Sequence, residues 1–282
     1  MFVYSPSWMG VWLTGLLDER RVCFCPTIEY GIRHNTSFHM VAMTTRLFRD
    51  LSSVKLDYSS FADGIEGITV LNQDISDLDV ARLAGAMAGS VVRVSSDTII
   101  TKDSEGTSLI DVPTIKLVVE NEAYLEKPME RHILEQDTGG ALAILDNSLF
   151  KLNGVSQGKN IAAQSVAYQI HTAKRLGFSC IQTVAAGRPG SMLTGWKVWP
   201  RMGYDGVVDE GILAKLPISE RMKLQTEAAV PITVQRLLDA CGRELWEQYG
   251  EAMPMSIDLK KLNHRARSLV SRFVEQENGR TR

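Results

Sequence analysis

The sequence predicts an α/β (α+β) protein in which a mixed, splayed β-sheet is flanked by helices and followed by a helical C-terminal extension. Two observations predict this fold. Across residues 139–186 the spacing of apolar residues changes from that of a strand to that of a helix and back, which gives the order strand, turn, helix, strand. Beyond residue 209, three segments combine helical spacing with charges on one face: they are 210–225, 234–249 and 259–275.

The composition is that of a globular chain that can bury a core. Its 282 residues are 44% hydrophobic and 23% charged, as is usual for folded domains. The formal net charge of −2 excludes a global basic field that would attract nucleic acid. No segment reaches the roughly 18 consecutive apolar residues of a membrane span. No Lys or Arg precedes the short apolar run near the N-terminus, so we expect no secretory signal.

The cysteines and histidines predict neither a disulfide framework nor a metal site. Four cysteines in a chain of this length are too few for a disulfide scaffold, and Cys23 and Cys25 lie in an apolar stretch. The five histidines are scattered, and none has a second ligand at metal spacing. We therefore expect a cytoplasmic protein with reduced, mostly buried thiols and no bound metal.

Apolar spacing and capping residues define the elements of the first half of the chain. Residues 1–59 form an N-terminal extension that has few clear signals. The predicted elements are a helix over 37–51, a helix over 79–87 ended by Gly89 and followed by a strand, a hairpin over 99–110, a strand over 113–121, and a helix over 122–137 that Pro128 interrupts.

The central segment has the clearest pattern. Residues 139–145 form an apolar run after two glycines, which predicts a buried strand that continues to 152 after a break at Asp146. A helix over about 160–176 follows, and Gly177 suits the left-handed residue that ends a helix. Residues 178–186 form the next buried strand. Since the connection is long enough for a crossover, the two strands are expected to be parallel or splayed neighbours.

The turn that opens this helix has the properties of a phosphate site. It contains Gly158, Lys159 and Asn160 and leads directly into the helix. A helix N-terminus offers unpaired backbone N–H groups and the positive end of a dipole, which together bind anions. Gly158 lets the backbone approach a ligand, and Lys159 adds positive charge. Every helix has such an end, however, so a well-capped core helix is the structural alternative.

Strand, turn, helix and strand, followed by "LTGWKVWPRMGYD" at 193–205, resemble the core of the GNAT acyltransferase superfamily. The later segment is most similar to the "NGYYTWPRxGF" version found in phage-encoded and uncharacterised bacterial GNAT-like domains. The resemblance covers 139–206 best, and it implies a GNAT-like domain over 60–208 with an N-terminal extension at 1–59 and a helical C-terminal extension at 209–282.

The resemblance implies that acetyl-CoA is the cosubstrate. In the family, backbone N–H groups of a Q/R-x-x-G-x-G/A turn hold the pyrophosphate, and the pantetheine arm lies between two splayed strands. The residues of this chain that match the turn are Gln157, Gly158, Lys159, Asn160, Ile161 and Ala162. The family has a glycine at the position of Asn160. Asn tolerates unusual backbone angles better than most residues.

Acyl transfer to an amine needs a base for the ammonium and an acid for the leaving thiolate. Asp146, at the strand break, is the carboxylate best placed to act as the base, with Glu135 and Asp137 as weaker candidates. Tyr204 is the nearby phenol that could act as the acid, since Trp199 stands where the family has its tyrosine. For both Asp146 and Tyr204 a purely structural role, as a strand bulge or a packed aromatic residue, is the alternative.

Two functions from different classes follow from these observations. The first is an acyl-CoA-dependent N-acyltransferase that acts on an amine of unspecified type. The second is a catalytically inactive GNAT-like scaffold that acts as a binding or assembly protein and uses the C-terminal helices for a protein partner or a second copy. A nucleotide-binding protein of another α/β type is disfavoured, because the chain lacks the glycine-rich motifs of those folds. Neither function involves a membrane or nucleic acid.

Overall fold

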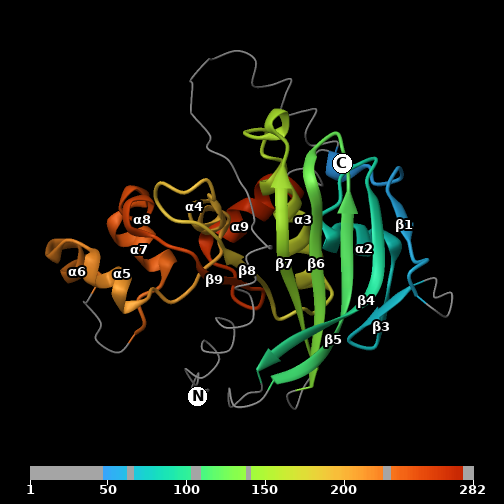
Figure 1. Cartoon of the computed structure of the whole chain (residues 1–282), viewed down its shortest axis with the longest axis horizontal. Coiled ribbons are helices and arrows are strands. Elements are labelled where there is room, and N and C mark those ends of the chain that lie inside the picture. Colours follow the sequence, from blue (N-terminus) through green and yellow to red (C-terminus); the bar gives the residue numbers. More distant parts are fainter. Residues whose placement is uncertain (1–46, 62–66, 103–108, 138–140, 225–229, 276–282) are drawn as a thin grey trace.

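The computed structural model describes residues 47–61, 67–102, 109–137, 141–224 and 230–275 (Figure 1). The strands are β1 (Lys55–Asp57), β2 (Ile68–Val70), β3 (Gln73–Ile75), β4 (Val91–Lys102), β5 (Leu109–Glu120), β6 (Leu125–Asp137), β7 (Ala141–Leu152), β8 (Cys180–Ala185) and β9 (Met253–Asp258). The α-helices are α2 (Asp77–Ala84), α3 (Ile161–Arg175), α4 (Gly195–Val198), α5 (Glu210–Lys215), α6 (Ile218–Leu224), α7 (Val234–Cys241), α8 (Arg243–Tyr249) and α9 (His264–Val270). Shorter turns of helix are η2 (Gly154–Ser156), η3 (Trp199–Met202) and η4 (Ser271–Glu275).

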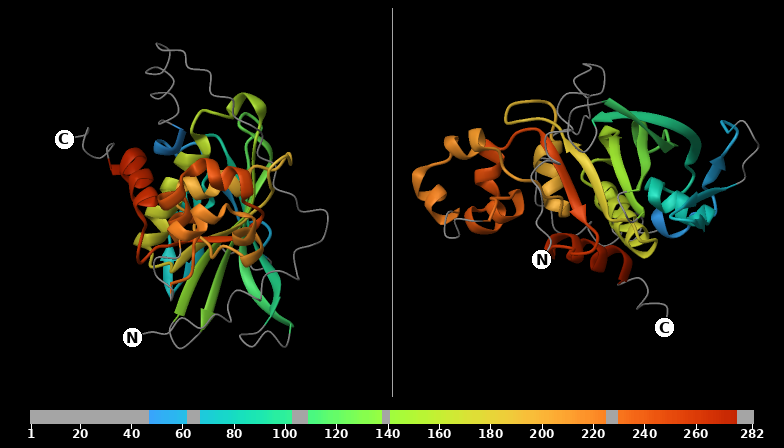
Figure 2. Two further views of the ribbon diagram at one scale, coloured as in Figure 1. Left: turned by 90° about the vertical axis from the view of Figure 1, so that its left-hand side faces the viewer. Right: turned by 90° about the horizontal axis from the view of Figure 1, so that it is seen from below.

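Seven strands form one mixed sheet in the order β1-β4-β5-β6-β7-β8-β9, and β2 and β3 form a separate hairpin. The pairs β1–β4 and β7–β8 are parallel and the others are antiparallel. Helices α3 and α9 lie on the same side of the sheet (Figure 2, right), and α5 to α8 form a cluster beside it (Figure 1). The predicted fold class, a mixed sheet flanked by helices with further helices at the C-terminal end, is confirmed.

The sheet has two chemically different faces, which we call the helix face and the far face. The helix face packs against α3, because Asn147 of β7 bonds Gln169 of α3. Side chains alternate between the faces along each strand, so Asp146 belongs to the far face. Cross-strand register aligns one row of residues on each face. The helix-face row is Val94, Leu117, Arg131, Asn147, Thr183 and Met255, and the far-face row is Ser95, Lys116, His132, Asp146, Gln182 and Ser256.

The order strand, helix, strand predicted for the central segment is confirmed, but the break predicted at Asp146 is wrong, because β7 is continuous and Asp146 is paired with His132 of β6. β7, α3 and β8 fall within the predicted ranges, and β7 and β8 are parallel neighbours. The predicted hairpin over 99–110 and strand over 113–121 are parts of the β4–β5 pair. The helix predicted over 79–87 is α2, and it ends earlier than predicted. Gly85 terminates it in the left-handed conformation with φ +69°, where a residue without a Cβ costs least.

The helix predicted over 122–137 is wrong, because these residues form β6. Pro128 has no backbone N–H for the ladder. The register between β6 and β7 shifts three times between Leu125 and Arg131, and such bulges are where a strand accommodates proline. Leu134 and Ile133 are both buried at about 1% exposure, so both faces of the strand are covered at this point.

The three helical segments predicted after residue 209 are present, but the first two are each interrupted and the third begins later than predicted, at His264. Pro217 separates α5 from α6, and Gly242 with φ +88° separates α7 from α8. Residues 253–258 form β9, which the sequence did not predict and which pairs with β8 along its whole length. The C-terminal region therefore completes the sheet as well as adding helices. The helix predicted over 37–51 lies mostly outside the described residues.

Candidate functional site

Strands β7 and β8 separate beside the turn that the sequence singles out. Their parallel pairing runs from Ile144 with Cys180 to Asn147 with Thr183 and stops there, although β7 continues to Leu152. Beyond this point β8 stays paired with β9 on its other side. Thr183 marks the end of the pairing, where its Oγ1 donates a hydrogen bond of 2.8 Å to the carbonyl of Asn147. The two strands thus diverge toward the N-terminal end of α3.

In the turn before α3, side chains form hydrogen bonds with backbone groups. Asn153 accepts a bond from the N–H of Ser156 at 3.0 Å and donates one to the carbonyl of Ala123 at 2.9 Å. The Gln157 amide donates to the carbonyl of Leu152 at 3.2 Å, which ties the turn to the end of β7. Gly158 then takes φ +73°, a conformation that glycine adopts without strain.

Asn160 occupies the position that decides the shape of the turn. It is the N-cap of α3 and adopts the left-handed conformation, with φ 59° and ψ 15°. Glycine and asparagine are the residues that enter this region at least cost. The backbone at this position therefore has the conformation that favours the glycine of the family motif, and Asn160 is compatible with it.

The first turn of α3 has backbone N–H groups without an intrahelical partner. The first backbone bond into the helix runs from Gln164 N to the carbonyl of Asn160 at 2.9 Å. The N–H groups of the preceding turn have no partner within the helix, and no side chain caps them. Gly158, Lys159 and Asn160 are exposed, whereas Ile161 is buried in the core and anchors the helix. An anion at this end would meet the N–H groups, the helix dipole and Lys159.

A narrow apolar pocket lies next to this end of α3. Its volume is about 20 Å³, close to the space of one water molecule. Phe150 and Leu152 of β7, Ala162 of α3, and residues of α4 and η3 line it; those of α4 and η3 are Gly195, Val198, Trp199 and Met202. The pocket is apolar and too small to hold more than about one water molecule.

Asp146 lies on the far face of the sheet in a polar setting. It is half-buried, and Ser148 donates a hydrogen bond of 2.6 Å to its Oδ2. Burial raises the pKa of the Asp146 carboxyl above its usual value, while the bonds from Ser148 and Gln182 and the charges of His132 and Arg131 act in the opposite direction. A carboxyl with a raised pKa is a better proton acceptor than an ordinary one when ionised.

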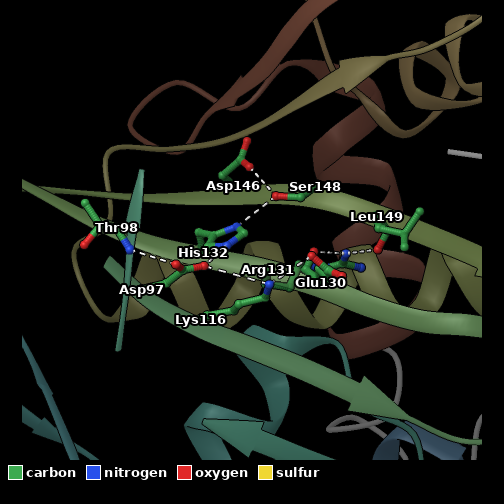
Figure 3. A network of polar contacts seen from close by, with 9 residues as sticks. All are labelled: Asp97, Thr98, Lys116, Glu130, Arg131, His132, Asp146, Ser148 and Leu149. Carbon is green, nitrogen blue, oxygen red and sulfur yellow. Dashed lines mark hydrogen bonds and ion pairs between the residues drawn. The ribbon is translucent and has the colours of Figure 1, made fainter. Parts of the chain in front are cut away.

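His132 connects Asp146 to a second carboxylate. The ring is only 2% exposed, and its Nδ1 lies 2.9 Å from Ser148 Oγ while its Nε2 lies 3.3 Å from Oδ2 of Asp97 (Figure 3). Burial lowers the pKa of His132, and the negative charges of Asp146 and Asp97 work against this. Asp146, Ser148, His132 and Asp97 thus form a continuous chain across three strands, which we call the acid–histidine chain.

Lys116 and the backbone hold the Asp97 end of this chain. Lys116 Nζ lies 3.8 Å from Asp97 Oδ2 and 3.3 Å from Oε2 of Glu130, and the N–H of Thr98 donates to Asp97 Oδ1 at 2.8 Å. Burial raises the pKa of Asp97, but the contacts with Thr98, His132 and Lys116 outweigh it and leave the pKa below its usual value. Asp97 is therefore an anion at neutral pH.

Tyr204 lies on the helix face, on the side of the sheet opposite to the Asp146 carboxylate. It is fully buried, and its hydroxyl accepts a hydrogen bond of 2.7 Å from Asn147 Nδ2. Its ring meets Trp199 edge to face at a centroid distance of 4.9 Å. Burial raises the pKa of the phenol well above its usual value. The structure therefore brings Tyr204 into a buried amide network and does not bring it to Asp146.

Glu135, one of the two weaker base candidates, has a structural contact, as does Arg201 of the aromatic segment. Glu135 accepts a bond of 2.6 Å from the N–H of Leu71, which has φ 53° in the β2–β3 turn. Arg201 is ion-paired with Glu247. Neither contact links these residues to the turn or to Asp146. Asp137, the other weaker candidate, is the last residue of β6.

Sequence reasoning missed three residues of the acid–histidine chain, namely Ser148, His132 and Asp97. Both His132 and Glu130 belong to the segment predicted as a helix, and a helix would not place His132 opposite Asp146. The signal that could have found them is the alternation of side chains between the two faces of a strand. If residues 129–135 are read with a period of two, Glu130 and His132 share one face, as do Asp146 and Ser148.

Comparisons with protein families, with curated proteins and with solved structures find no match to this chain. Within the described ranges, no helix is both long enough and apolar enough to span a bilayer. Across the same residues, no three His, Cys, Asp or Glu side chains gather as a metal site would require.

Proposed function

We propose that this protein is an acyl-CoA-dependent N-acyltransferase that moves an acetyl group from acetyl-CoA to an amine. The observation that carries the proposal is the separation of β7 from β8 beside the uncapped N-terminus of α3. A parallel pair that opens toward a helix N-terminus offers a slot for an extended thioester arm and N–H groups for its diphosphate.

The turn supports this proposal through its backbone conformation. The pyrophosphate would lie against 157–162, with its negative charge near Lys159 and the N–H groups without an intrahelical partner. The left-handed conformation of Asn160 keeps this backbone in the shape that the resemblance requires. The pantetheine arm would enter the apolar pocket beside Ala162, and the pocket would have to widen as Trp199 and Met202 move.

Asp146 would act as the base in this reaction. The amine approaches as an ammonium ion, and one of its protons must leave before nitrogen can attack the thioester. Asp146 lies on β7 within the paired region, one residue before the strands separate. Its carboxylate is on the far face, whereas the pocket residue Trp199 packs on Tyr204 at the helix face. The thioester carbonyl would therefore have to reach through the gap between β7 and β8 to meet an amine held at Asp146. As the C–N bond forms and the C–S bond breaks, the second proton leaves the nitrogen and ends on the thiol of CoA.

The alternative function is a catalytically inactive scaffold that acts as a binding or assembly protein. The closed pocket of about 20 Å³ and the burial of Tyr204 favour it. The cluster of helices α5 to α8 beside the sheet would then supply surface for a protein partner or a second copy. The two functions differ in one requirement, since a scaffold need not bind acetyl-CoA.

Calorimetric titration with acetyl-CoA tests the proposal. We expect binding to the native protein, and a ligand at about 100 times its dissociation constant should add about 2.7 kcal/mol to the free energy of unfolding. Asn160→Asp should weaken binding at least about tenfold, because it keeps the shape of the side chain and places a negative charge at the pyrophosphate. Asn160→Gly is the matched control and should preserve or tighten binding.

Two outcomes would contradict the enzyme proposal. Native protein and Asn160→Gly that both fail to bind acetyl-CoA would favour the scaffold. Binding that Asn160→Asp leaves unchanged would place the ligand away from this turn. If binding holds, release of free thiol in the presence of a panel of amines, including small polyamines and lysine peptides, would then identify the acceptor class.

A further inference from the structure

The acid–histidine chain has a feature that the base assignment alone does not use: its protons can be arranged in two complete ways. Ser148 Oγ lies 2.6 Å from Asp146 Oδ2 and 2.9 Å from His132 Nδ1. A hydroxyl has one proton to donate, so it can serve only one of these neighbours and must accept from the other. Which neighbour donates depends on where the next proton lies.

Asp97 determines the protonation of Nε2, the other nitrogen of the His132 imidazole. Its carboxylate accepts from Thr98 N and faces His132 Nε2 at 3.3 Å. A carboxylate anion can only accept, so Nε2 carries a proton in every arrangement. Nδ1 is then the nitrogen that gains or loses a proton, and it is the nitrogen that contacts Ser148.

We propose that Asp146 and His132 share one proton through Ser148, so that a proton taken up by Asp146 moves on to His132. In the first arrangement Asp146 is protonated and donates to Ser148 Oγ, and Ser148 donates to neutral Nδ1. In the second, Ser148 donates to the Asp146 carboxylate, and Nδ1–H of the imidazolium donates to Ser148. The two differ only by the shift of one proton along each bond, and the contacts among Asp146, Ser148, His132 and Asp97 are satisfied in both.

The surrounding charges make the second arrangement accessible. An imidazolium at His132 would lie between the carboxylates of Asp146 and Asp97, which stabilise it, and Lys116 acts against it from β5. Glu130 partly neutralises Lys116 at 3.3 Å. Arg131 on the helix face and the amide of Gln182 on β8 favour the ionised Asp146 carboxylate.

The consequence for the proposed transferase, on which this step rests, is regeneration of the base. One ammonium proton goes to Asp146 and then, by two hops through Ser148, to Nδ1 of His132. Asp146 returns to its anionic form while the amine is still bound, and the proton goes back through Ser148 and Asp146 to water once the product has left. His132 and Ser148 touch no substrate in this scheme and act as relay residues, so their removal should alter the pH dependence of the reaction more than substrate affinity.

Nuclear magnetic resonance of the full chain labelled with ¹⁵N-histidine tests the shared proton without any substrate. His132→Gln identifies the His132 signals among those of the five histidines. We expect neutral His132 to be the Nε2–H tautomer and its pKa to fall in Asp146→Asn, where the attracting charge is gone. Ser148→Ala should also lower this pKa, and Ser148→Thr, which keeps the hydroxyl, should restore it.

The double variant gives the sharpest result. If the proton is shared through Ser148, the effects of Asp146→Asn and Ser148→Ala on the His132 titration are not additive. Additive effects, an Nδ1–H tautomer, or a His132 titration that Ser148→Ala leaves unchanged would overturn the proposal. Titration with acetyl-CoA distinguishes failure of the proton relay from failure of the proposed transferase function. A coupled titration without acetyl-CoA binding would refute the transferase alone, and binding with an uncoupled titration would refute the relay alone.

Discussion

Asp146 and Asn147 are neighbours on strand β7, yet their side chains enter opposite faces of the sheet and opposite electrostatic settings. Asn147 belongs to a buried network with Gln169 and Tyr204, in which the bonds run between neutral groups. Asp146 belongs to a chain in which burial raises the pKa of its carboxyl and lowers that of His132. The helix-face network joins amides and a phenol whose pKa burial raises, whereas the proposed far-face chain has two proton arrangements.

Under the proposed function, the helix face serves structure and the far face serves chemistry. A buried amide loses stability when a partner is removed, because the remaining group cannot reach water. A carboxyl with a raised pKa is already costly for the fold, so its removal need not destabilise the protein. Substitutions at adjacent positions should therefore have opposite consequences, and each prediction below tests one side of this contrast.

The largest effect is expected for Asp146→Asn on acyl transfer. Loss of a general base typically slows turnover by about 10² to 10⁴, and the variant should keep its affinity for acetyl-CoA. Its thermal stability should be equal to or higher than that of the native protein at pH 7. Single-turnover transfer rates with calorimetric affinities measure this. A transfer rate within threefold of the native rate would remove Asp146 from the reaction.

Asn147→Leu should show the reverse pattern. It removes the partner of the Tyr204 hydroxyl and of the Gln169 amide in a region without solvent, so we expect a loss of roughly 2–4 kcal/mol in the free energy of unfolding. Denaturant unfolding measures the loss. Ser95→Ala, on the far-face row, is the control for a mild substitution in the sheet. Equal stability of the Asn147→Leu and Ser95→Ala proteins would contradict a structural role for the helix-face network.

The pH dependence of stability should separate the two faces more finely. The raised pKa of Asp146 means that the folded state binds its proton more tightly than the unfolded state does. Its stabilising contribution to the free energy of unfolding is therefore fully present below the pKa of the unfolded state, near 3.8. That contribution is lost as pH rises through the pKa of the folded state. The lowered pKa of His132 acts oppositely: its contribution is present above 6.5 and is lost as pH falls through the folded pKa.

Asp146→Asn should thus become more stable relative to the native protein as pH rises from about 4, by at most about 1.4 kcal/mol per pH unit. Asn147→Leu should remain destabilised by a constant amount over the same range, because no amide titrates there. Urea unfolding at half-unit steps from pH 4 to 8 measures both. A difference between native and Asp146→Asn proteins that does not change with pH would mean that burial has not raised the Asp146 pKa.

The sequence predicted the order of the central elements better than the contacts on the far face of the sheet, for physical reasons. The order strand, turn, helix, strand at 139–186 could be predicted because β7, α3 and β8 each have a strong local period. The far-face chain could not, since His132 and Asp97 meet Asp146 only through cross-strand register, and the helical reading of 122–137 hid the period of β6. The edge strand β9 was missed because it is short and contains Pro254, and proline within a run argues against a strand.

The same contrast applies to the two catalytic candidates. Asp146 was predicted as the base from a strand break, but β7 runs without interruption through this position. Its place in the acid–histidine chain comes from cross-strand register instead. Tyr204 was predicted as the acid from its position in the aromatic segment, and sequence spacing could not show which face its side chain would enter. Its side chain is fixed by the Trp199 ring and the Asn147 amide, contacts that depend on tertiary packing.

Tyr204→Phe should have the smallest effect. The variant keeps the ring contact with Trp199 and loses one hydrogen bond, whose donor, Asn147 Nδ2, retains Gln169 Oε1 at 3.3 Å. We expect a loss of about 0.5–1.5 kcal/mol in the free energy of unfolding and a transfer rate within threefold of the native rate. A phenol whose pKa is raised by burial is a poor proton donor to a thiolate, and water entering the opened slot would protonate it instead. A fall in the transfer rate of about 10² or more, with unchanged acetyl-CoA affinity, would instead mean that the slot opens far enough to expose the hydroxyl. It would make the helix face part of the chemistry and remove the contrast between Asp146 and Asn147.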